Sequence, residues 1–396
     1  MKRSTERILT THVGSLARAD SLIPLLRQRE QGQPYDREEL ARLVREAVSE
    51  VVRKQVEAGI DIVTDGEQGK SGFFGYVIER FNGFERKPPA PGKEMRPRSA
   101  GREYLAFPAY YAWSERIAEP FGGRSGRRGE NVDICTGPVS YRGREAVQAD
   151  IANLKAAIKG RVHEDIFMPA IASSYIAATF ANEYYRTHEE YEQAVSDAMR
   201  EEYKAIVDAG LILQIDDPRL VTYYMMHPEL CVADCRKWAA ERIEVINNSI
   251  RDIPPERVRF HTCYSIDVGP RIHEMDLKDI VDIMLKINAG AYSFEAANPR
   301  HEHEYHVFER VKLPAGKILI PGVISHTTNL VEHPELVAER IVRFAKIVGR
   351  ENVIAGADCG FAASALRFND THPSVAWLKF AALAEGARLA TVELWN

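Results

Sequence analysis

The stretch DREELARLVREAVSEVVRKQVEAGIDIVTD, residues 36–65, carries the pattern that decides the fold. Its first part repeats apolar residues at helical spacing, so residues 36–57 predict a helix, with Asp36 as N-cap and Gly59 just past the end. The short apolar run at residues 60–65 predicts a strand that ends in acidic residues. A long helix followed by a short buried strand is typical of proteins with a parallel sheet.

The same alternation of helix and strand recurs on both sides of this stretch. Further strands are predicted at residues 8–13, 211–215, 258–263, 291–295, 318–323 and 353–357, and further helices at 191–209 and 233–249. Residues 132–136 and 166–170 both fit the third strand, which is one candidate more than a barrel of eight strands needs. One of the two is therefore expected to be an accessory strand.

Polar or reactive residues follow nearly every predicted strand, and this favours a closed barrel. In a barrel the chemistry lies at the carboxyl ends of the strands, whereas a doubly wound sheet gathers its site at one switch point. No glycine-rich dinucleotide fingerprint is present. We expect an α/β fold, a (β/α)₈ TIM barrel, forming a single catalytic domain over residues 1–396 with a segment inserted after the second strand at about 84–130.

The inserted segment is rich in proline, glycine and arginine and carries the aromatic cluster Tyr110-Tyr111-Ala112-Trp113. Insertions of this size often form a lid or an oligomer contact. A partly disordered surface loop has the same composition. The sequence leaves both interpretations open, and with them a possible homo-oligomer.

Composition excludes several classes of function. A net charge of −5 over 396 residues gives no case for nucleic acid as a partner. The chain has no apolar run long enough to cross a bilayer, and charged residues 1–7 lack the apolar core of a signal peptide. Five cysteines in a chain of this length do not form a disulfide framework. We expect a cytoplasmic protein with reduced thiols that acts on small molecules.

His261-Thr262-Cys263 places two side chains that can bind a metal at i and i+2 of a strand, on the same face. Glu295 ends the next predicted strand and Cys359 follows the last one, so a barrel would bring all four to one mouth. Two thiolates, one imidazole and one carboxylate form a plausible tetrahedral zinc shell, and the sulfur ligands argue against magnesium or calcium. Packing of a His-x-Cys pair in a buried strand is the alternative that spacing alone leaves open.

Such a ligand set indicates thiol chemistry. A zinc ion with two thiolates and a carboxylate keeps its net charge if an incoming thiol loses its proton and displaces Glu295. A free thiol has a pKa of about 8.5, so coordination would supply the deprotonation. This suits alkyl transfer to sulfur better than hydrolysis, for which neutral histidine ligands and a bound water are commoner.

Several motifs along almost the whole chain resemble one family. They are Thr11-His12-Val13-Gly14-Ser15, Asp65-Gly66-Glu67, Thr136-Gly137-Pro138, Gln214-Ile215-Asp216-Asp217-Pro218, His261-Thr262-Cys263-Tyr264, Glu295, His326 and Asp358-Cys359-Gly360. Together they resemble the catalytic C-terminal barrel of cobalamin-independent methionine synthase, within the uroporphyrinogen-decarboxylase-like group of barrels.

The resemblance implies roles for individual residues. The implied zinc ligands are His261, Cys263, Glu295 and Cys359. The implied substrate-binding residues are Gly14 and Ser15 for the carboxylate of homocysteine, and Glu67 and Asp216 for its amino group. His326 is implied as the catalytic acid that protonates the departing folate nitrogen, because an amine leaves poorly unless it is protonated.

Departures from the family pattern leave the alkyl donor open. The full family enzyme is about twice as long, no tryptophan follows Thr136-Gly137-Pro138, and Asp217 replaces a glutamate. The resemblance implies a zinc-dependent S-methyltransferase acting on a thiol such as homocysteine, with a 5-methyltetrahydrofolate-type donor uncertain. The alternative on the same zinc core is an epoxide–thiol transferase of the coenzyme M type, whose sulfonate would favour arginine over Glu67 and Asp216. A lyase of the decarboxylase type and a non-catalytic zinc protein are more distant alternatives.

Overall fold

The computed structural model describes residues 1–88, 98–119, 132–264, 269–365 and 371–396. Eight parallel strands form one sheet in the order β1-β11-β10-β9-β8-β7-β5-β2. They are β1 (Leu9–Thr10), β2 (Ile62–Val63), β5 (Asp165–Ile171), β7 (Ile212–Asp216), β8 (Val258–His261), β9 (Ala291–Phe294), β10 (Ile318–Ile324) and β11 (Ile354–Ala357). A parallel bridge between Thr11 and Ile62 joins the two ends of this sheet. The predicted (β/α)₈ barrel is confirmed.

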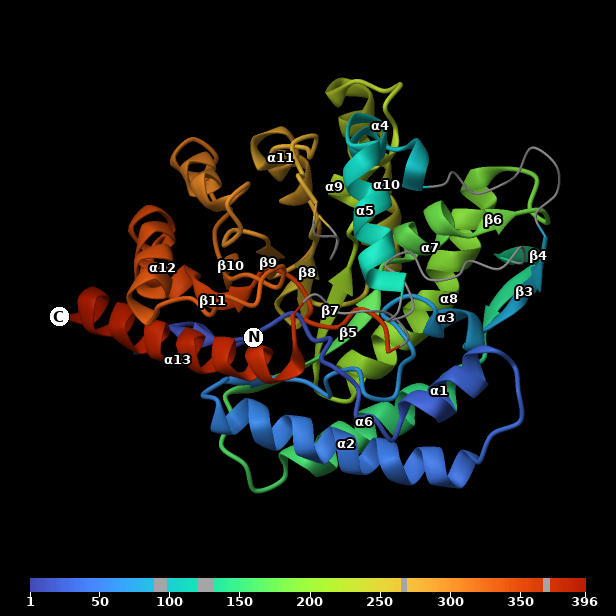
Figure 1. Cartoon of the computed structure of the whole chain (residues 1–396), viewed down its shortest axis with the longest axis horizontal. Helices are drawn as coiled ribbons and strands as arrows, with labels where there is room; N and C mark the ends of the chain where they lie inside the picture. The colour runs from blue at the N-terminus through green and yellow to red at the C-terminus, as the bar shows by residue number, and fades with distance from the viewer. Residues whose placement is uncertain (89–97, 120–131, 265–268, 366–370) are drawn as a thin grey trace.

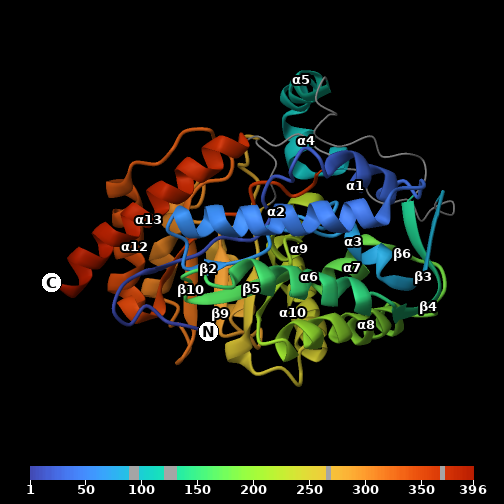
Figure 2. The ribbon, with the colours of Figure 1, turned by 90° about the horizontal axis from the view of Figure 1, so that it is seen from below.

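Helices form the outer layer around the strands (Figures 1 and 2). The long ones are α2 (Arg37–Glu57), α6 (Arg144–Ile158), α8 (His188–Asp208), α10 (Val232–Ser249), α12 (Pro334–Val348) and α13 (Pro373–Trp395). Shorter ones are α1 (Ile23–Glu30), α3 (Tyr76–Glu79), α7 (Ser173–Thr179), α9 (Arg219–Met226), α11 (Val281–Met284) and the 3₁₀ helix η5 (Glu302–Glu309). None of the helices in the described ranges combines the length and apolarity needed to cross a membrane.

Helix α2 begins and ends as its sequence predicts. The side chain of Asp36 accepts a hydrogen bond from the backbone N–H of Glu39 at 3.0 Å, which caps the first turn. Gly59, just past the end, has a φ of 84°, a conformation that a side chain would disfavour. The chain can therefore turn at once into β2.

The alternation of side chains along each strand separates two cores. Leu213 and Ile215 of β7 point outward into the layer between strands and helices. Ile212 belongs to a second, inner cluster at the base of the barrel with Leu9, Ile62, Phe167, Ala291, Ile318, Ile320 and Ile354. Because strand residues two apart share a face, Gln214 and Asp216 continue the inner face of β7 toward the mouth. The interior thus changes from apolar at the base to polar at the top.

Two candidates competed for the third strand, and the structure assigns them to different sheets. β5 lies in the barrel between β2 and β7. β4 (Val132–Tyr141) instead pairs with β3 (Phe81–Lys87) and β6 (Ala181–Asn182) in a separate three-stranded sheet. The prediction that one of them is accessory is confirmed.

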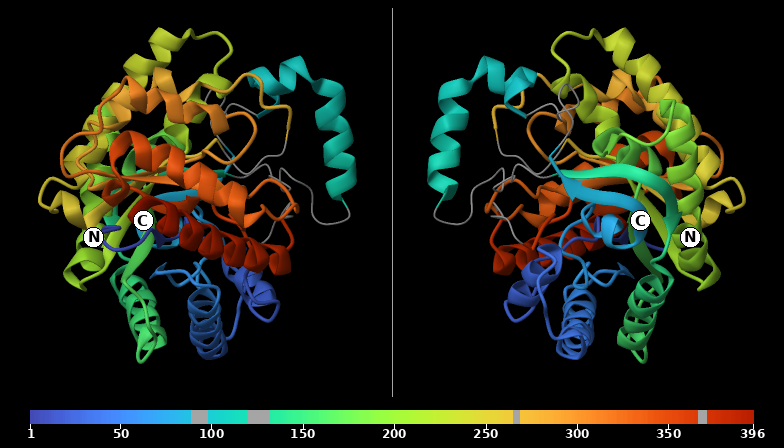
Figure 3. Two further views of the ribbon diagram at one scale, coloured as in Figure 1. Left: turned by 90° about the vertical axis from the view of Figure 1, so that its left-hand side faces the viewer. Right: turned by 90° about the vertical axis from the view of Figure 1, so that its right-hand side faces the viewer.

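Between β3 and β4 the described part of the inserted segment contains η1 (Arg98–Ala100), α4 (Arg102–Ala106) and α5 (Pro108–Ala118). Helix α5 stands away from the body of the barrel (Figure 3). Helix α4 is anchored by Arg102, whose guanidinium donates to the backbone carbonyl of Tyr224 at 2.9 Å. The organisation of residues 1–396 as a single domain with an insertion at about 84–130 stays a prediction.

A buried ionic cluster fastens the accessory sheet to the barrel. Glu202 of α8 accepts hydrogen bonds from the hydroxyls of Tyr76 at 2.9 Å and Tyr141 at 2.6 Å. It also pairs with Arg80 at 3.0 Å, and Arg80 in turn pairs with Asp150 of α6. Burial acts to raise the pKa of Glu202, but Arg80, Lys70 and the Tyr141 hydroxyl together hold the pKa below its ordinary value. The charged carboxylate is therefore part of the folded structure.

We expect Glu202→Gln to destabilise the protein by about 3 kcal/mol, because removing one partner of a buried ion pair leaves the other charge uncompensated. Glu201→Gln is the matched control, since Glu201 pairs with Arg144 on the surface and its loss is expected to cost less than about 1 kcal/mol. Urea unfolding of both variants measures the difference. Equal midpoints for the two variants would contradict the role given to Glu202.

Candidate active site

The residues predicted to bind a metal lie where strands β8, β9 and β11 end. His261 is the last residue of β8, Cys263 follows two residues later, Glu295 follows β9 and Cys359 follows β11. Strands β8 and β9 are neighbours in the barrel, whereas β11 is separated from β9 by β10. The barrel therefore gathers residues that lie far apart in the sequence.

His261, Cys263 and Cys359 form a compact buried cluster, which we call the ligand triad. One ligand atom from each lies within 4.8 Å of the others. The Sγ of Cys359 donates to the Sγ of Cys263 at 3.0 Å, and both thiols are free. Two sulfurs and one ring nitrogen at this spacing can bind a common ion.

The imidazole of His261 is oriented for metal binding. Its Nδ1 is hydrogen bonded to the hydroxyl of Ser293 on β9 at 3.1 Å. Its Nε2 is buried and has no hydrogen-bond partner among the described residues. A buried polar atom without a partner is unfavourable unless something binds it. Metal-binding histidines are typically held through their other ring nitrogen in this way.

The electrostatics of the triad fit a cation. Burial, reinforced by Arg259, lowers the pKa of His261 to about 3, so the imidazole is neutral and can donate a lone pair. Contact with the Cys263 thiol and burial raise the pKa of Cys359 well above its ordinary value. A bound cation would reverse that shift, because a coordinated thiol gives up its proton. The donor set therefore fits zinc, the thiophilic ion that two cysteines and a histidine bind.

Glu295 lies beside the triad and belongs to a second buried group with His326 and Asp358, whose ligand atoms are within 4.8 Å of one another. Both of its oxygens already accept hydrogen bonds. The backbone N–H of Tyr264 donates to Oε1 at 2.7 Å, and Arg271 and Asn298 donate to Oε2 at 2.8 Å and 2.5 Å. Three of the four predicted zinc ligands are thus brought together, and the fourth is held next to them.

Asp358 connects the two groups. Its Oδ1 accepts hydrogen bonds from the backbone N–H groups of Ala296 at 2.7 Å and Ala297 at 2.8 Å. Burial and the nearby charge of Glu295 raise the pKa of Asp358 to about 7. This aspartate therefore ties the end of β11, which carries Cys359, to the loop that carries Glu295.

Gly14 and Ser15 form a tight turn after β1. Gly14 has a φ of 126°, and a Cβ there would lie 2.6 Å from Cγ of Pro169, so no other residue fits without displacement. The hydroxyl of Ser15 donates to the carbonyl of Ala362 and accepts from Arg18 Nη1 at 3.1 Å. The turn is thereby fixed against the segment that follows Cys359.

Glu67 and Asp216 interact with each other across the mouth. Burial and the charge of Glu67 raise the pKa of Asp216 well above its ordinary value. Glu67 has a φ of 56°, and its carboxylate lies 3.5 Å from Arg18 and 3.6 Å from Lys70. A buried acid whose pKa is raised by a neighbouring carboxylate lies in a site that favours a positively charged group.

Several buried cations near the site were not found from the sequence. Arg259 could have been, because it lies two residues before His261 and shares the inner face of β8. Its guanidinium donates to Gln214 at 2.6 Å and to Thr11 at 2.9 Å and lies 3.6 Å from the centre of the Phe167 ring. Arg18 and Arg271 lie on loops, where no periodicity marks the direction of a side chain.

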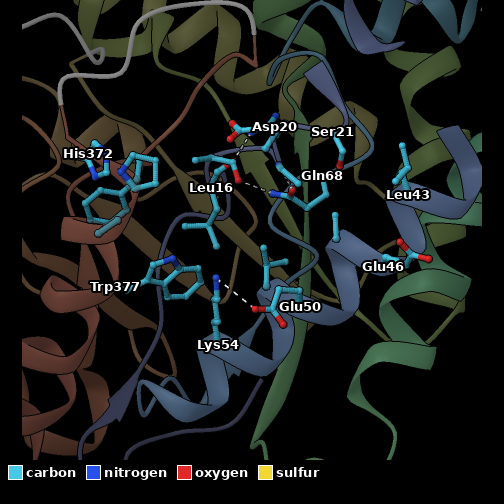
Figure 4. Close-up of a pocket in the computed structure, with 18 of the residues that line it drawn as sticks. Leu16, Asp20, Ser21, Leu43, Glu46, Glu50, Lys54, Gln68, His372 and Trp377 are labelled. Atoms are coloured by element: carbon cyan, nitrogen blue, oxygen red, sulfur yellow. Dashed lines mark hydrogen bonds and ion pairs between the residues drawn. The ribbon is translucent and has the colours of Figure 1, made fainter. Parts of the chain in front are cut away.

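A separate cavity of about 570 Å³ opens between the loop after Ser15, helix α2 and the start of α13 (Figure 4). Leu16, Gln68, Lys54 and Trp377 are among its lining residues, and the Lys54 ammonium lies 5.7 Å from the centre of the Trp377 ring. None of the predicted zinc ligands lines it.

Fold and site together define a barrel enzyme with a thiol-rich, buried ligand cluster at its catalytic mouth. Residues 172–381, slightly more than half of the chain, match the family described as "Cobalamin-independent synthase, Catalytic domain". The chain belongs to this family, as the sequence motifs predicted. It is therefore an enzyme that methylates a thiol.

Relatives extend the likeness over nearly the whole chain. A methionine synthase of Thermococcus kodakarensis is 24% identical over 97% of this chain and 94% of its own length, and one of Saccharolobus solfataricus is 25% identical over 97% and 95%. The solved structure of a B12-independent methionine synthase from Shewanella sp. W3-18-1, in complex with selenomethionine, superposes with a TM-score of 0.71 at 21% identity, covering 98% of this chain and 99% of that one. The chain spans nearly the whole length of each of these relatives.

Proposed function

We propose that this protein is a zinc-dependent methyltransferase that methylates the thiol of homocysteine to give methionine. The observation that carries the proposal is the ligand triad, in which ligand atoms of His261, Cys263 and Cys359 lie within 4.8 Å of one another and the buried Nε2 of His261 has no hydrogen-bond partner among the described residues. Family membership supports the reaction type, and the methionine synthases among the relatives support the thiol.

The triad would hold the zinc ion through His261, Cys263 and Cys359, and Glu295 of the second buried group would be the fourth ligand. Bound zinc would keep the substrate thiol deprotonated at neutral pH. Ser293 keeps the His261 ring in its binding orientation, and Asp358 keeps the loop of Glu295 against β11. Each of these contacts orients a ligand, which is a common role of the residues around a metal site.

The amino-acid part of the substrate has matching groups nearby. Glu67 and Asp216 would bind the ammonium group, and its arrival would favour the ionised form of Asp216, whose pKa is raised in its absence. Gly14 and Ser15 would hold the carboxylate at the turn after β1. His326, buried beside Glu295 and Asp358, would protonate the leaving nitrogen of the methyl donor, for which a 5-methyltetrahydrofolate-type compound is our proposal.

An epoxide–thiol transferase would use the same triad with a different acceptor. Its sulfonate-bearing thiol would need a cation in place of the acids Glu67 and Asp216. Of the buried cations here, Arg18 and Lys70 already pair with Glu67, and Arg259, which acts on Asp216, is already hydrogen bonded to Gln214 and Thr11. The arrangement therefore supports an amino-acid thiol.

Zinc-edge X-ray absorption of the zinc-loaded protein, before and after addition of homocysteine, tests the proposal. We expect the shell to change from two sulfurs to three as the substrate thiol joins the two cysteines. A change with coenzyme M and none with homocysteine would favour the epoxide alternative. An unchanged shell with both thiols would show a zinc that no substrate reaches and would refute the proposal.

A further inference from the structure

Glu295 is expected to bind a metal, yet both of its carboxylate oxygens already accept hydrogen bonds from protein groups. Its side chain is buried, and its two oxygens accept three hydrogen bonds, from Tyr264, Arg271 and Asn298. A carboxylate with this many donors is stable where it lies and needs no further partner. This position of Glu295 is therefore a built binding place for the carboxylate outside the ligand triad.

Arg271 supplies the positive charge of that place. The distance between its Nη2 and the carboxylate is 2.8 Å. An isolated carboxylate at this depth would be strongly unfavourable, so Arg271 is what allows Glu295 to stay charged away from a metal.

Arg271 is held in place even without Glu295. Its Nε donates to Glu274 at 2.5 Å, and the other oxygen of Glu274 is hydrogen bonded to His301 at 2.9 Å. The ring of His301 stacks on Tyr264, with the ring centres 4.0 Å apart. If Glu295 moved to the triad, Arg271 would keep Glu274 as its counter-ion and would not become an unpaired buried charge.

We propose that Arg271 is a positioning residue that receives the Glu295 carboxylate when a substrate thiol takes the fourth place beside His261, Cys263 and Cys359. The inference rests on the proposed function. The exchange keeps the charge of the ligand set constant, because the thiol releases one proton to solvent as one carboxylate leaves. Arg271 makes the departure of Glu295 favourable by pairing it at once with a buried cation.

The inserted segment helps to hold Arg271 in this position. Glu103 of α4 accepts hydrogen bonds from the backbone N–H of Arg271 at 3.1 Å and of His273 at 2.7 Å. Arg271 has a φ of 56°, a left-handed conformation that non-glycine residues rarely adopt without support. Glu103 supplies that support, so the insertion holds the arginine in the direction of Glu295.

The test compares Arg271→Met with Arg340→Met in the zinc-loaded protein. Arg340 is also a buried arginine with a carboxylate partner, Glu302, but it lies on α12 away from the triad. We expect Arg271→Met to keep its zinc and to bind homocysteine roughly 10- to 100-fold more weakly than the wild type, the usual effect of removing a residue that orients a metal ligand. Its zinc-edge spectrum should keep two sulfurs at homocysteine concentrations that give the wild type three, whereas Arg340→Met should follow the wild type.

Different results overturn different claims. Unchanged homocysteine affinity and a normal three-sulfur shell in Arg271→Met would overturn the inference and leave the proposed function intact. Loss of zinc from Arg271→Met, but not from Arg340→Met, would show that Arg271 stabilises the metal site itself and would also overturn it. If the zinc shell of the wild type does not change when homocysteine is added, both the inference and the proposed function are overturned.

Two further variants keep the test decisive if Arg271→Met does not fold. Arg271→Lys keeps the charge but loses the planar fork that contacts Glu274 and Glu295 together, so we expect unchanged zinc and weaker homocysteine binding than in the wild type. Glu103→Gln removes the charge that holds the Arg271 loop and is expected to weaken homocysteine binding in the same direction. Wild-type affinity in both variants would refute the role of Arg271.

Discussion

Cys359→Ser is expected to lose most of its zinc and all methyl transfer while the barrel stays folded. Cys359 supplies one of the two sulfurs of the ligand triad, and a serine oxygen is a poor substitute for a thiolate on zinc. Residues that merely orient a ligand change metal affinity about 10- to 100-fold, so losing a ligand should cost at least the upper end of that range. Zinc content after dialysis against a weak chelator, together with the far-ultraviolet circular dichroism spectrum, measures both parts of the expectation.

Cys235→Ser is the matched control, because Cys235 is a buried free thiol on α10 that lies outside the triad. We expect this variant to keep its zinc and its activity. Full zinc occupancy in Cys359→Ser would refute the ligand assignment, and equal zinc loss in both variants would point to general destabilisation.

The second large effect is expected from Asp216→Asn. This change should weaken binding of homocysteine by about 30-fold or more, since losing one partner of a buried charge pair costs about 2 kcal/mol or more. Binding of a plain alkyl thiol such as propanethiol should change little, because that ligand has no ammonium group. Calorimetric titration of the zinc-loaded variant with each thiol gives the two ratios.

Asp217→Asn is the control that separates recognition of the substrate's ammonium group from a general effect on the folded structure. The carboxylate of Asp217 is used by the hydroxyl of Ser174 and the backbone N–H groups of Arg219 and Leu220, at the start of α9. Its replacement should lower stability and affect both thiols alike. If Asp216→Asn also affected both thiols alike, the case for an amino-acid substrate would be lost.

The barrel could be predicted from the sequence because its strands and helices differ in period and length. The pattern of residues 36–65 predicted both α2 and β2, including the cap at Asp36. The choice between β4 and β5 could not be made in this way, since both are short apolar runs. Only pairing with distant strands places β5 in the barrel and β4 in the accessory sheet.

The ligand triad was predictable for a similar reason. His261 and Cys263 are two residues apart, and Cys359 follows a strand, so the barrel alone brings them to one mouth. The position of Glu295 was not predictable, because it depends on Arg271. That arginine lies on a loop whose left-handed conformation is supported by a helix of the insertion, and no sequence period reports such a contact.

The long separation between the two cysteines of the triad also determines when the proposed ligand set is complete during synthesis of the chain. Cys263 and Cys359 are 96 residues apart, and β11, which precedes Cys359, also pairs with β1 to close the barrel. At 5–20 residues per second, a ribosome needs roughly 5–20 s to add that stretch. During this interval the nascent chain lacks the second sulfur of the ligand triad. The proposed ligand set is thus complete only when the last barrel strand has been made, the strand that also pairs with β1.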